Sequence, residues 1–270
     1  MRLAIHHVTR YTFDEPLTRG LQRLRLTPKS TSGQKVLEWR MSFAGGCGEA
    51  EYDDQNHNRT TLISLNAGIT ELVITCEGVV ETNDHLGVIG RHAGYLPMWH
   101  FLDPTAATAP GPKIRTLLAG VARDDGAVPT LHRLSHAILE QLPYETGVTD
   151  TGTSAEEAVA ASRGVCQDHA HVFIACARLL GIPARYVSGY LMMTDRVDQD
   201  AGHAWGEAFV AGLGWVGFDV SNGISPDQRY VRVATGRDYH EAAPVTGITF
   251  GAHDETMHVN LAVRQQHVEQ

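Results

Sequence analysis

The repeat of hydrophobic and polar positions changes near the middle of the chain. In the first hundred residues, apolar and polar side chains alternate along short stretches, which is typical of half-buried β-strands. The predicted strands lie at residues 3–13, 20–28, 36–43, 60–66 and 70–82. Clusters of Gly, Ser, Asn and Asp separate them at 27–34, 44–58 and 66–68, and these clusters predict turns. This pattern predicts a β-rich domain, arranged as a sandwich or a meander.

One predicted strand, 20–28, carries arginines on a single face. Strict alternation places Leu21, Arg23 and Arg25 on one side of the strand and Gln22, Leu24 and Leu26 on the other. With Arg19, these residues form a local basic cluster, which we interpret as a solvated strand face.

A segment rich in Pro, Ala and Thr, residues 103–112, divides the two patterns. We therefore predict a β-rich N-terminal domain over residues 1–102 and a second domain over 103–270. Apolar residues in the second part first recur every three or four positions, which predicts helices. The predicted helices lie at 113–124, 129–142, 154–162 and 165–182.

The pattern then returns to alternation. Residues 184–193 predict one strand, and residues 203–219 predict a hairpin that turns around Gly212 and Gly214. At least two more strands follow within 229–266. Helices followed by an antiparallel sheet predict an α+β fold for this second domain.

Composition and charge narrow the range of functions. The net charge of −9 argues against nucleic acid as a partner, because phosphate binding requires a surplus of Lys and Arg. No apolar run approaches the ~20 residues that span a bilayer, and the N-terminal residues lack the apolar region of a signal peptide. We therefore expect a cytoplasmic protein without a membrane or nucleic-acid partner; its oligomeric state is not determined by the sequence.

The cysteines and histidines favour neither disulfides nor a metal. None of Cys47, Cys76, Cys166 and Cys176 has a zinc-site spacing, and we interpret all four as reduced thiols. His132 and His136 have a metal-ligand spacing on one helix face, but no HExxH pattern accompanies them. We predict neither a metal nor a cofactor, and a metallohydrolase remains the third hypothesis for function.

Cys166 lies at the predicted start of the helix 165–182. The unpaired N–H groups and the positive dipole end of a helix favour the thiolate, which is the nucleophilic form of cysteine. The backbone N–H of the cysteine also faces the place where an oxyanion develops. A cysteine in an apolar helix is by itself more typical of a buried core residue than of a nucleophile, so this interpretation depends on its partners.

His203 and Asp219 are those partners. His203 begins the first strand of the predicted hairpin, and Asp219 ends the second. If the register joins the faces that carry them, the carboxylate orients the imidazole while the other ring nitrogen reaches the thiol. Such a set supplies a nucleophile, a base and an orienting acid.

Two segments carry a family resemblance: SRGVCQDHAHVFIACARLLGIPARYVSGY (162–190) and GHAWGEAFVAGLGWVGFDVSNG (202–223). Their motifs, order and spacing resemble the transglutaminase-like superfamily, whose core has the papain-type arrangement. The start of the chain resembles the N-terminal β domain of its bacterial members. The resemblance implies that Cys166 is the nucleophile, His203 the general base and then acid, and Asp219 the orienting acid. Val220 stands where many members have proline, which affects the turn more than the carboxylate.

Four further residues are candidates for lining the cleft or assisting an oxyanion: Trp205, Asp168, His169 and Tyr144. Asp168 is also suited to the positive end of a helix, and His169 lies about one turn beyond Cys166. Trp205 offers an indole N–H, although a core tryptophan has the same pattern.

These observations predict an enzyme that attacks an amide or peptide bond through a thioester. With water as acceptor it is a cysteine peptidase or amidase acting on a peptide or protein, and we favour this reading because no amine site and no calcium loop is recognisable. The alternatives are a protein-glutamine transglutaminase, with an amine as acceptor, and a non-catalytic binding module that retains the fold.

Overall fold

The structure is a computed structural model that describes residues 1–123 and 126–266. Its strands, in chain order, are β1 Arg2–Phe13, β2 Arg19–Thr27, β3 Gln34–Ala44, β4 Gly46–Asp53, β5 Arg59–Leu65, β6 Glu71–Thr82, β7 Val88–Gly90, β8 Ala184–Leu191, β9 Asp198–Gln199, β10 His203–Val210, β11 Gly214–Phe218, β12 Tyr230–Gly236, β13 Val245–Phe250 and β14 Glu255–Gln265. Its helices are α1 Pro112–Ala119, α2 Ala127–Gln141, α3 Ala155–Ala161, α4 Cys166–Leu179 and α5 Tyr239–Ala242, with two 3-10 turns, η1 Met98–Phe101 and η2 Ala106–Thr108.

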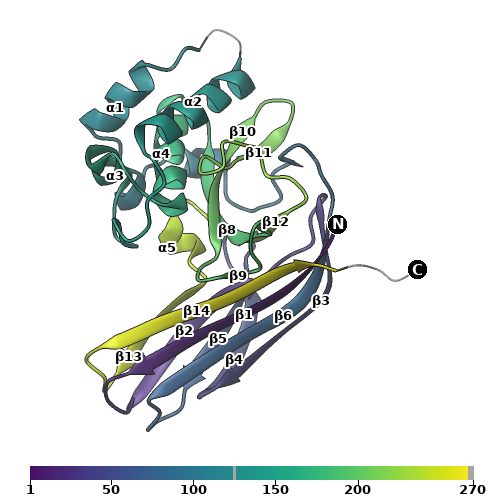
Figure 1. Cartoon of the computed structure of the whole chain (residues 1–270), viewed down its shortest axis with the longest axis vertical. Coiled ribbons are helices and arrows are strands. Elements are labelled where there is room, and N and C mark those ends of the chain that lie inside the picture. Colours follow the sequence, from purple (N-terminus) through teal and green to yellow (C-terminus); the bar gives the residue numbers. More distant parts are fainter. Residues whose placement is uncertain (124–125, 267–270) are drawn as a thin grey trace.

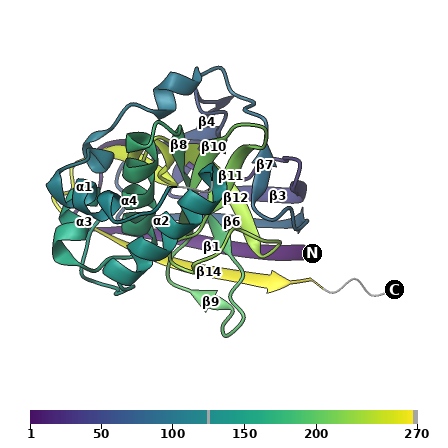
Figure 2. The same ribbon diagram turned by 90° about the horizontal axis from the view of Figure 1, so that it is seen from above.

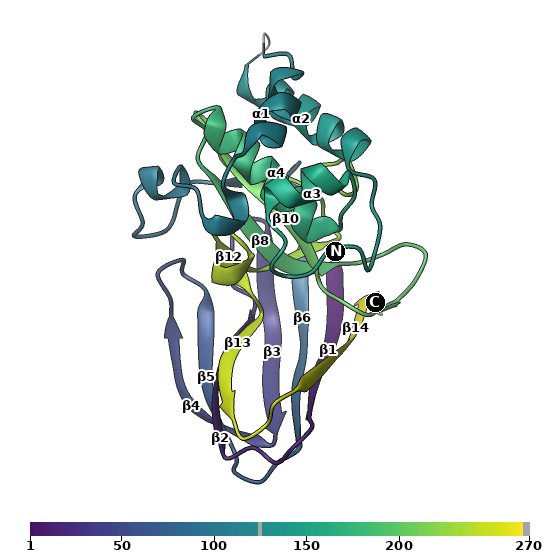
Figure 3. The same cartoon turned by 90° about the vertical axis from the view of Figure 1, so that its left-hand side faces the viewer.

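Two antiparallel sheets form a sandwich from long, twisted strands (Figures 1 and 3). One sheet has the order β3-β6-β1-β14-β9 and the other β13-β2-β5-β4. Alternation in β1 buries every second side chain, including Tyr11 and Phe13, against Leu24 and Ile63 of the facing sheet. The hydrophobic effect over this interface holds the two layers together.

The sandwich is completed by the far end of the chain. β14 pairs with β1 from Leu3–Gln265 to Phe13–Glu255, and β13 pairs with β2. The predicted second domain, 103–270, includes these C-terminal strands, whereas in the structure they are hydrogen-bonded to strands within the first 27 residues. Residues 267–270 of that predicted domain lie outside the described residues. A strand's pattern shows which face is buried, but not which distant strand it pairs with.

A third sheet, of order β12-β8-β10-β11-β7, carries the helices (Figures 1 and 2). The predicted hairpin is confirmed: β10 pairs with β11 in the register Gly206–Phe218 to Val210–Gly214. α4 packs across this sheet, with the ring of Phe173 over Gly206; a Cβ there would lie 2.5 Å from Phe173 Cδ1. α1, α2 and α3 pack around α4, so nearly all of its residues are buried.

Two details of the first hundred residues differ from the predictions. The segment 44–58, predicted as a turn, contains β4, whose side chains are mostly exposed and therefore lack alternation. Arg25 is not on a solvated face. It is 2 % exposed and bonds to Asp54 through Nε at 2.8 Å, beside a bulge between Leu24 and Thr27.

The helical region follows the predicted order. α3 begins with a capping box, in which the Ser154 hydroxyl accepts from the Glu157 N–H and the Glu157 carboxylate accepts from the Ser154 N–H. Asp124, the last residue of the first predicted helix, lies outside the described residues. The predicted linker 103–112 contains the turn η2. Within residues 1–123 and 126–266, no helix has the length and apolarity needed to cross a bilayer.

Candidate active site

Cys166 is the first residue of α4. The preceding residue, Val165, is extended, so α4 begins abruptly and its first N–H groups have no helical acceptors. The side chain of Asp168 folds back and accepts a hydrogen bond from the Val165 N–H at 2.8 Å. Gly164 makes this possible, because a Cβ there would lie 2.7 Å from the Asp168 Cβ. The cysteine is half-buried, so its sulfur is held at a helix N-terminus yet remains accessible.

His203 and Asp219 meet as the hairpin register requires. Asp219 follows β11 directly and is fully buried, and its Oδ2 lies 2.6 Å from Nε2 of His203. His203 is 13 % exposed at the start of β10. The side chains of His203 and Cys166 line the same cavity, and their interaction contributes to the pKa of His203. Because Nε2 is occupied by Asp219, Nδ1 is the ring nitrogen that remains for the sulfur.

The environment of His203 favours its protonated form. Burial on its own lowers the pKa of an imidazole, but hydrogen bonds to Asp219 and Cys166 and their negative charges raise the pKa of His203 to about 10. Burial acts on Asp219 in the opposite sense, and the hydrogen bonds from His203, Tyr230 and Asn222 keep its pKa below the usual value. A protonated imidazole beside a carboxylate is therefore the state of this pair near neutral pH.

Asp219 is fixed by two residues that the sequence analysis did not identify. The Tyr230 hydroxyl donates to Oδ2 at 2.7 Å, and Asn222 Nδ2 donates to the same oxygen at 2.7 Å. A tight loop holds Asn222 in place, since the Asp219 and Ile224 backbones bond reciprocally at 2.8 and 3.2 Å. Asn222 lies three residues after Asp219, which is a usable local signal. Tyr230 comes from β12, and only the sheet brings it close.

Trp205 supports the imidazole from behind. Its ring stacks on His203, with centroids 6.2 Å apart, and packs edge-on against Tyr230 at 5.4 Å. It is 2 % exposed, and its indole N–H has no hydrogen-bond partner among the residues described. Trp205 therefore contacts the ring of His203 but does not line the cavity described below.

Asp168 and His169 hold α4 in position. The Thr149 hydroxyl donates to Asp168 Oδ2 at 2.7 Å, so this oxygen receives two hydrogen bonds from residues that precede α4. His169 Nε2 donates to the Leu142 carbonyl at 2.7 Å and Nδ1 accepts from the Ser221 hydroxyl at 2.8 Å. Burial lowers the pKa of His169, which matches this neutral role.

Tyr144 lies on the solvent side of the cysteine. Its side chain is 51 % exposed, and the strand-like bridge between Tyr144 and Gly164 places it beside the start of α4. Partial burial and then the negative charge of Cys166 raise the pKa of Tyr144. Of the four further candidates, Tyr144 is the one for which the charge of Cys166 raises the side-chain pKa.

A cavity of about 270 Å³ opens beside Cys166 and His203. α4 contributes Val165 and Gln167 to its lining, and β8 contributes Tyr186 and Tyr190. The opposite wall comes from the sandwich, through strands β1, β2 and β14. The two proposed reacting groups thus face a mainly apolar space that both halves of the chain enclose.

The other cysteines differ from Cys166 in accessibility. Cys76 and Cys176 are buried, which raises the pKa of each thiol to about 12, whereas Cys47 is exposed on the sandwich. All four are free thiols. His132 packs edge-on against Phe218, and within the described part of the chain no three His, Cys, Asp or Glu side chains cluster as a metal site requires.

Two family models match the chain. Residues 3–81 match the bacterial transglutaminase-like N-terminal region, and residues 115–220 match the transglutaminase-like superfamily. The second match spans α1 to the end of the hairpin and includes Cys166, His203 and Asp219.

Similar proteins match over almost the whole length. An uncharacterized protein of Mycobacterium leprae is 31 % identical over 272 residues, which cover 93 % of this chain and 94 % of the relative. One of Mycobacterium tuberculosis is 28 % identical, covering 92 % and 88 %. A crystal structure from Cytophaga hutchinsonii, described as that of a putative cysteine protease, has a TM-score of 0.78 at 23 % identity and covers 100 % of this chain and 92 % of its own. It has the same fold.

Proposed function

The chain belongs to the transglutaminase-like superfamily, and from this premise we propose that it is a cysteine-dependent hydrolase that cleaves amide or peptide bonds through a thioester. Cys166 is the nucleophile, His203 moves the proton, and Asp219 orients His203. The observation that carries the proposal is the hydrogen bond between His203 and Asp219, together with a half-buried Cys166 at the start of α4 that lines the same cavity as His203. All four cysteines are free thiols, which fits a reducing cytoplasm as the place of the reaction.

In the first step, the Cys166 thiolate attacks the carbonyl carbon and the C=O electron pair moves onto oxygen. The N–H groups at the start of α4 are placed to stabilise this oxyanion. When the tetrahedral intermediate collapses, the C–N bond breaks and the imidazolium of His203 gives its proton to the leaving nitrogen. The products are a thioester on Cys166 and a free amine.

In the second step, neutral His203 takes a proton from water as the water oxygen attacks the thioester carbonyl. The C–S bond then breaks, which releases a carboxylic acid and restores the thiolate–imidazolium pair. An amine follows the same route to a new amide. We assign water as the acceptor because the residues around Cys166 include no recognisable amine site.

The proposal is tested with a library of peptide amides and esters. We expect an acyl-enzyme on Cys166 by intact-mass spectrometry, and a fall of about 10³-fold or more in kcat for Cys166→Ala and Asp219→Asn. Far-UV circular dichroism of the variants controls for folding. Turnover that survives in Cys166→Ala, or labelling by iodoacetamide no faster at Cys166 than at Cys176, contradicts the proposal in favour of a non-catalytic module.

The acceptor is tested separately. The same donors are incubated with and without a primary amine, and products are separated by chromatography. Free acid should dominate in both cases. Dominant amide product would instead identify the protein as a transglutaminase while leaving the acylation step intact.

A further inference from the structure

The sandwich forms part of the cavity that contains the proposed nucleophile. Met257 and Val259 of β14 and Arg25 of β2 line the same space as Cys166 and His203. β14 is near the C-terminus and β2 near the N-terminus, so residues from both ends of the chain face the reacting groups. The cavity is therefore positioned to select a substrate through the sandwich.

Arg25 is the one charged side chain that the sandwich contributes to this lining. It is 2 % exposed, and its Nε donates to Asp54 Oδ2 at 2.8 Å. Its Nη1 is buried and has no hydrogen-bond partner within residues 1–123 and 126–266. A buried donor without an acceptor is costly, and Arg25 is one of the residues that line the cavity, so a ligand that reaches Nη1 from the cavity would supply the acceptor.

The Arg25–Asp54 pair is itself well supported. Asp54 also accepts from the Asn56 and Asn58 N–H groups at 2.9 Å and from Asn58 Nδ2 at 3.1 Å. Asn58 bonds in turn to the backbone of Thr235 on β12. The guanidinium is thus held rigidly against the core, with one edge used by Asp54 and Nη1 left over.

The charges around the cavity favour an anionic group. The described lining contains no Asp or Glu, and its two cations are Arg25 and protonated His203. His7 also lines it, but burial lowers the pKa of His7 to about 4, and its ring nitrogens are bonded to Tyr190 and Thr9. The remaining lining is mainly apolar, which suits a short hydrocarbon stretch between Cys166 and the anion.

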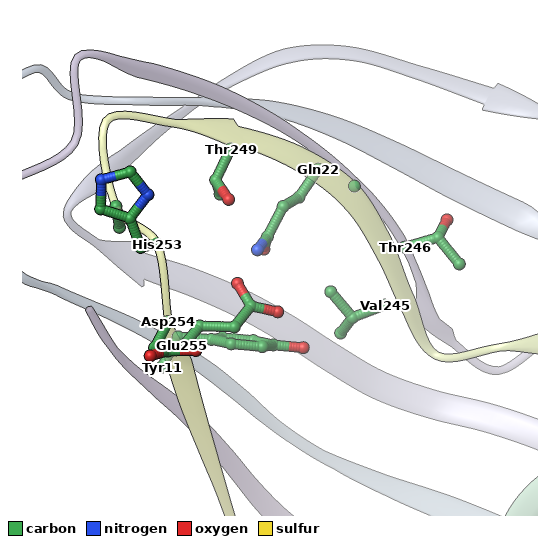
Figure 4. Close-up of a pocket in the computed structure, with 10 residues that line it drawn as sticks. Tyr11, Gln22, Val245, Thr246, Thr249, His253, Asp254 and Glu255 are labelled. Carbon is green, nitrogen blue, oxygen red and sulfur yellow. The ribbon is translucent and has the colours of Figure 1, made fainter. Parts of the chain in front are cut away.

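The acidic side chains lie in a neighbouring space. A second cavity of about 240 Å³, between β13 and the start of β14, is lined by Asp254 and Glu255, and Gln22 points into it (Figure 4). Tyr11 and Val245 line both cavities. Tyr11 and Val245 therefore separate the carboxylates of Asp254 and Glu255 from the cavity of Cys166. A cationic group would be attracted to the second cavity, not to the cavity of Cys166.

We propose that the cavity binds the acyl part of the substrate and that Arg25 anchors a free carboxylate at the distal end of that acyl group. The inference rests on the proposed function and names its substrate class: amides whose acyl part carries a carboxylate beyond a short apolar stretch. Arg25 is a specificity residue in this scheme, and the N-terminal β-rich segment is the part of the protein that recognises the acyl group.

The test uses irreversible reagents that need no knowledge of the acceptor. The reagents are three series of chloroacetamides with linear N-alkyl chains of two to six methylenes. The chain ends in a carboxylate in the first series, a primary carboxamide in the second and an ammonium group in the third. The second-order rate constant for alkylation of Cys166 is measured by intact-mass spectrometry on a Cys47→Ser background. At the best chain length, the carboxylate should react about 10- to 100-fold faster than the carboxamide, as expected for a charged hydrogen bond.

Two variants assign the preference to Arg25. Arg25→Gln with Asp54→Asn keeps a hydrogen-bonded neutral pair, and Arg25→Lys keeps the ion pair but removes the Nη1 donor. In both, the ratio of carboxylate to carboxamide rates should fall toward one. Arg23→Lys, on the exposed face of the same strand, is the matched control and should retain the full ratio.

The outcomes separate the two proposals. Slow iodoacetamide labelling of Cys166 contradicts the proposed function itself. If iodoacetamide labels Cys166 rapidly, three results overturn the role of Arg25 alone. These are equal rates for the carboxylate and carboxamide reagents, a faster rate for the ammonium reagent, and a carboxylate preference that persists in both Arg25 variants.

Discussion

At the scale of the residue, the site depends on how a few buried polar groups share their hydrogen bonds. Asp219 Oδ2 receives three donors, from His203, Asn222 and Tyr230. Each donor stabilises the charged carboxylate, and the carboxylate in turn stabilises the charged imidazole. Cys166 and Asp219 both raise the pKa of this ring.

Tyr230 provides a direct test of this arrangement. Tyr230→Phe removes one hydrogen bond from Asp219, and we expect kcat/KM to fall about tenfold. Its loss also raises the pKa of Asp219 toward the usual value, so the acidic limb of the pH–rate profile should move to higher pH. Tyr52→Phe on the exposed strand β4 is the control. If the acidic limb of the Tyr230→Phe profile matches that of the wild type, the Tyr230 hydroxyl does not set the pKa of Asp219 and the residue acts only in packing.

His171 predicts a loss of stability in acid. Its Nε2 accepts from the Tyr239 N–H at 3.1 Å, and burial lowers its pKa to about 4. The folded protein keeps this imidazole neutral, whereas the unfolded chain binds a proton below pH ~6.5. Stability is therefore present above pH 6.5 and is lost as the pH falls toward 4, by about 3 kcal/mol from this residue.

The measurement is urea denaturation at several pH values. His171→Gln keeps an acceptor without a group that titrates in this range, and it should reduce the slope of unfolding free energy between pH 6.5 and 4. His6→Gln, at a half-exposed position on β1, should leave the slope unchanged. A slope that is the same in His171→Gln and wild type would show that other groups cause the acid sensitivity.

At the scale of the element, helix ends decide where the chemistry is placed. α4 ends at Leu179, three residues before the predicted end of the helix, and Gly181 adopts the left-handed conformation with φ 74° directly after the C-cap. Its start is fixed by Asp168 and by the narrow space at Gly164. α1 has no cap of its own, and Glu156 of α3 accepts from the Gly111, Lys113 and Ile114 N–H groups at 3.0, 2.7 and 3.1 Å.

Glu156 therefore joins two helices through one carboxylate. Glu156→Ala should destabilise the protein by about 1–2 kcal/mol, because three N–H groups at the start of α1 lose their acceptor. Chemical denaturation gives the free energy of unfolding. Glu140→Ala, at an exposed position on α2, should change it by less than ~0.5 kcal/mol. Equal effects for the two variants would exclude a capping role for Glu156.

At the scale of the whole molecule, the two ends of the chain close the sandwich. β14 lies between β1 and β9, and its end is next to the start of β1, where the Gln266 N–H donates to the Arg2 carbonyl at 2.9 Å. Conversely, β7, residues 88–90 of the N-terminal part, pairs with β11 and is the edge strand of the sheet that carries His203. The two parts of the chain therefore exchange strands.

Truncation after residue 243 should unfold the sandwich, because it removes β13 and β14 and exposes the core side chains and the edge of β1. Loss of near-UV circular dichroism and binding of a hydrophobic dye would report this. The control is a circular permutant that begins at residue 244, continues from residue 266 through a short turn to residue 2, and ends at residue 243. It keeps β13 and β14 and should fold. Cooperative unfolding of the truncated chain at wild-type stability would contradict the prediction.

Much of the site was predictable because its signals are local. The period of apolar residues identified α4 and the hairpin β10–β11, and strand alternation fixed the faces that bring His203 and Asp219 together. Arg25 shows where such reasoning ends: alternation placed it on a solvated face, but Asp54 and the parts of the chain that enclose the cavity bury it. Tyr230 was missed because β12 joins the site only through sheet pairing.

The sequence by itself determined the helix that presents Cys166, the order of its partners and the family, because propensity, periodicity and motif spacing act over short stretches of chain. Tertiary structure decided what surrounds them: Tyr230 at Asp219, Arg25 in the cavity, and the C-terminal strands in the first sheet. These contacts join residues far apart in the chain, and their free energy comes from burial and pairing between surfaces that exist only after folding.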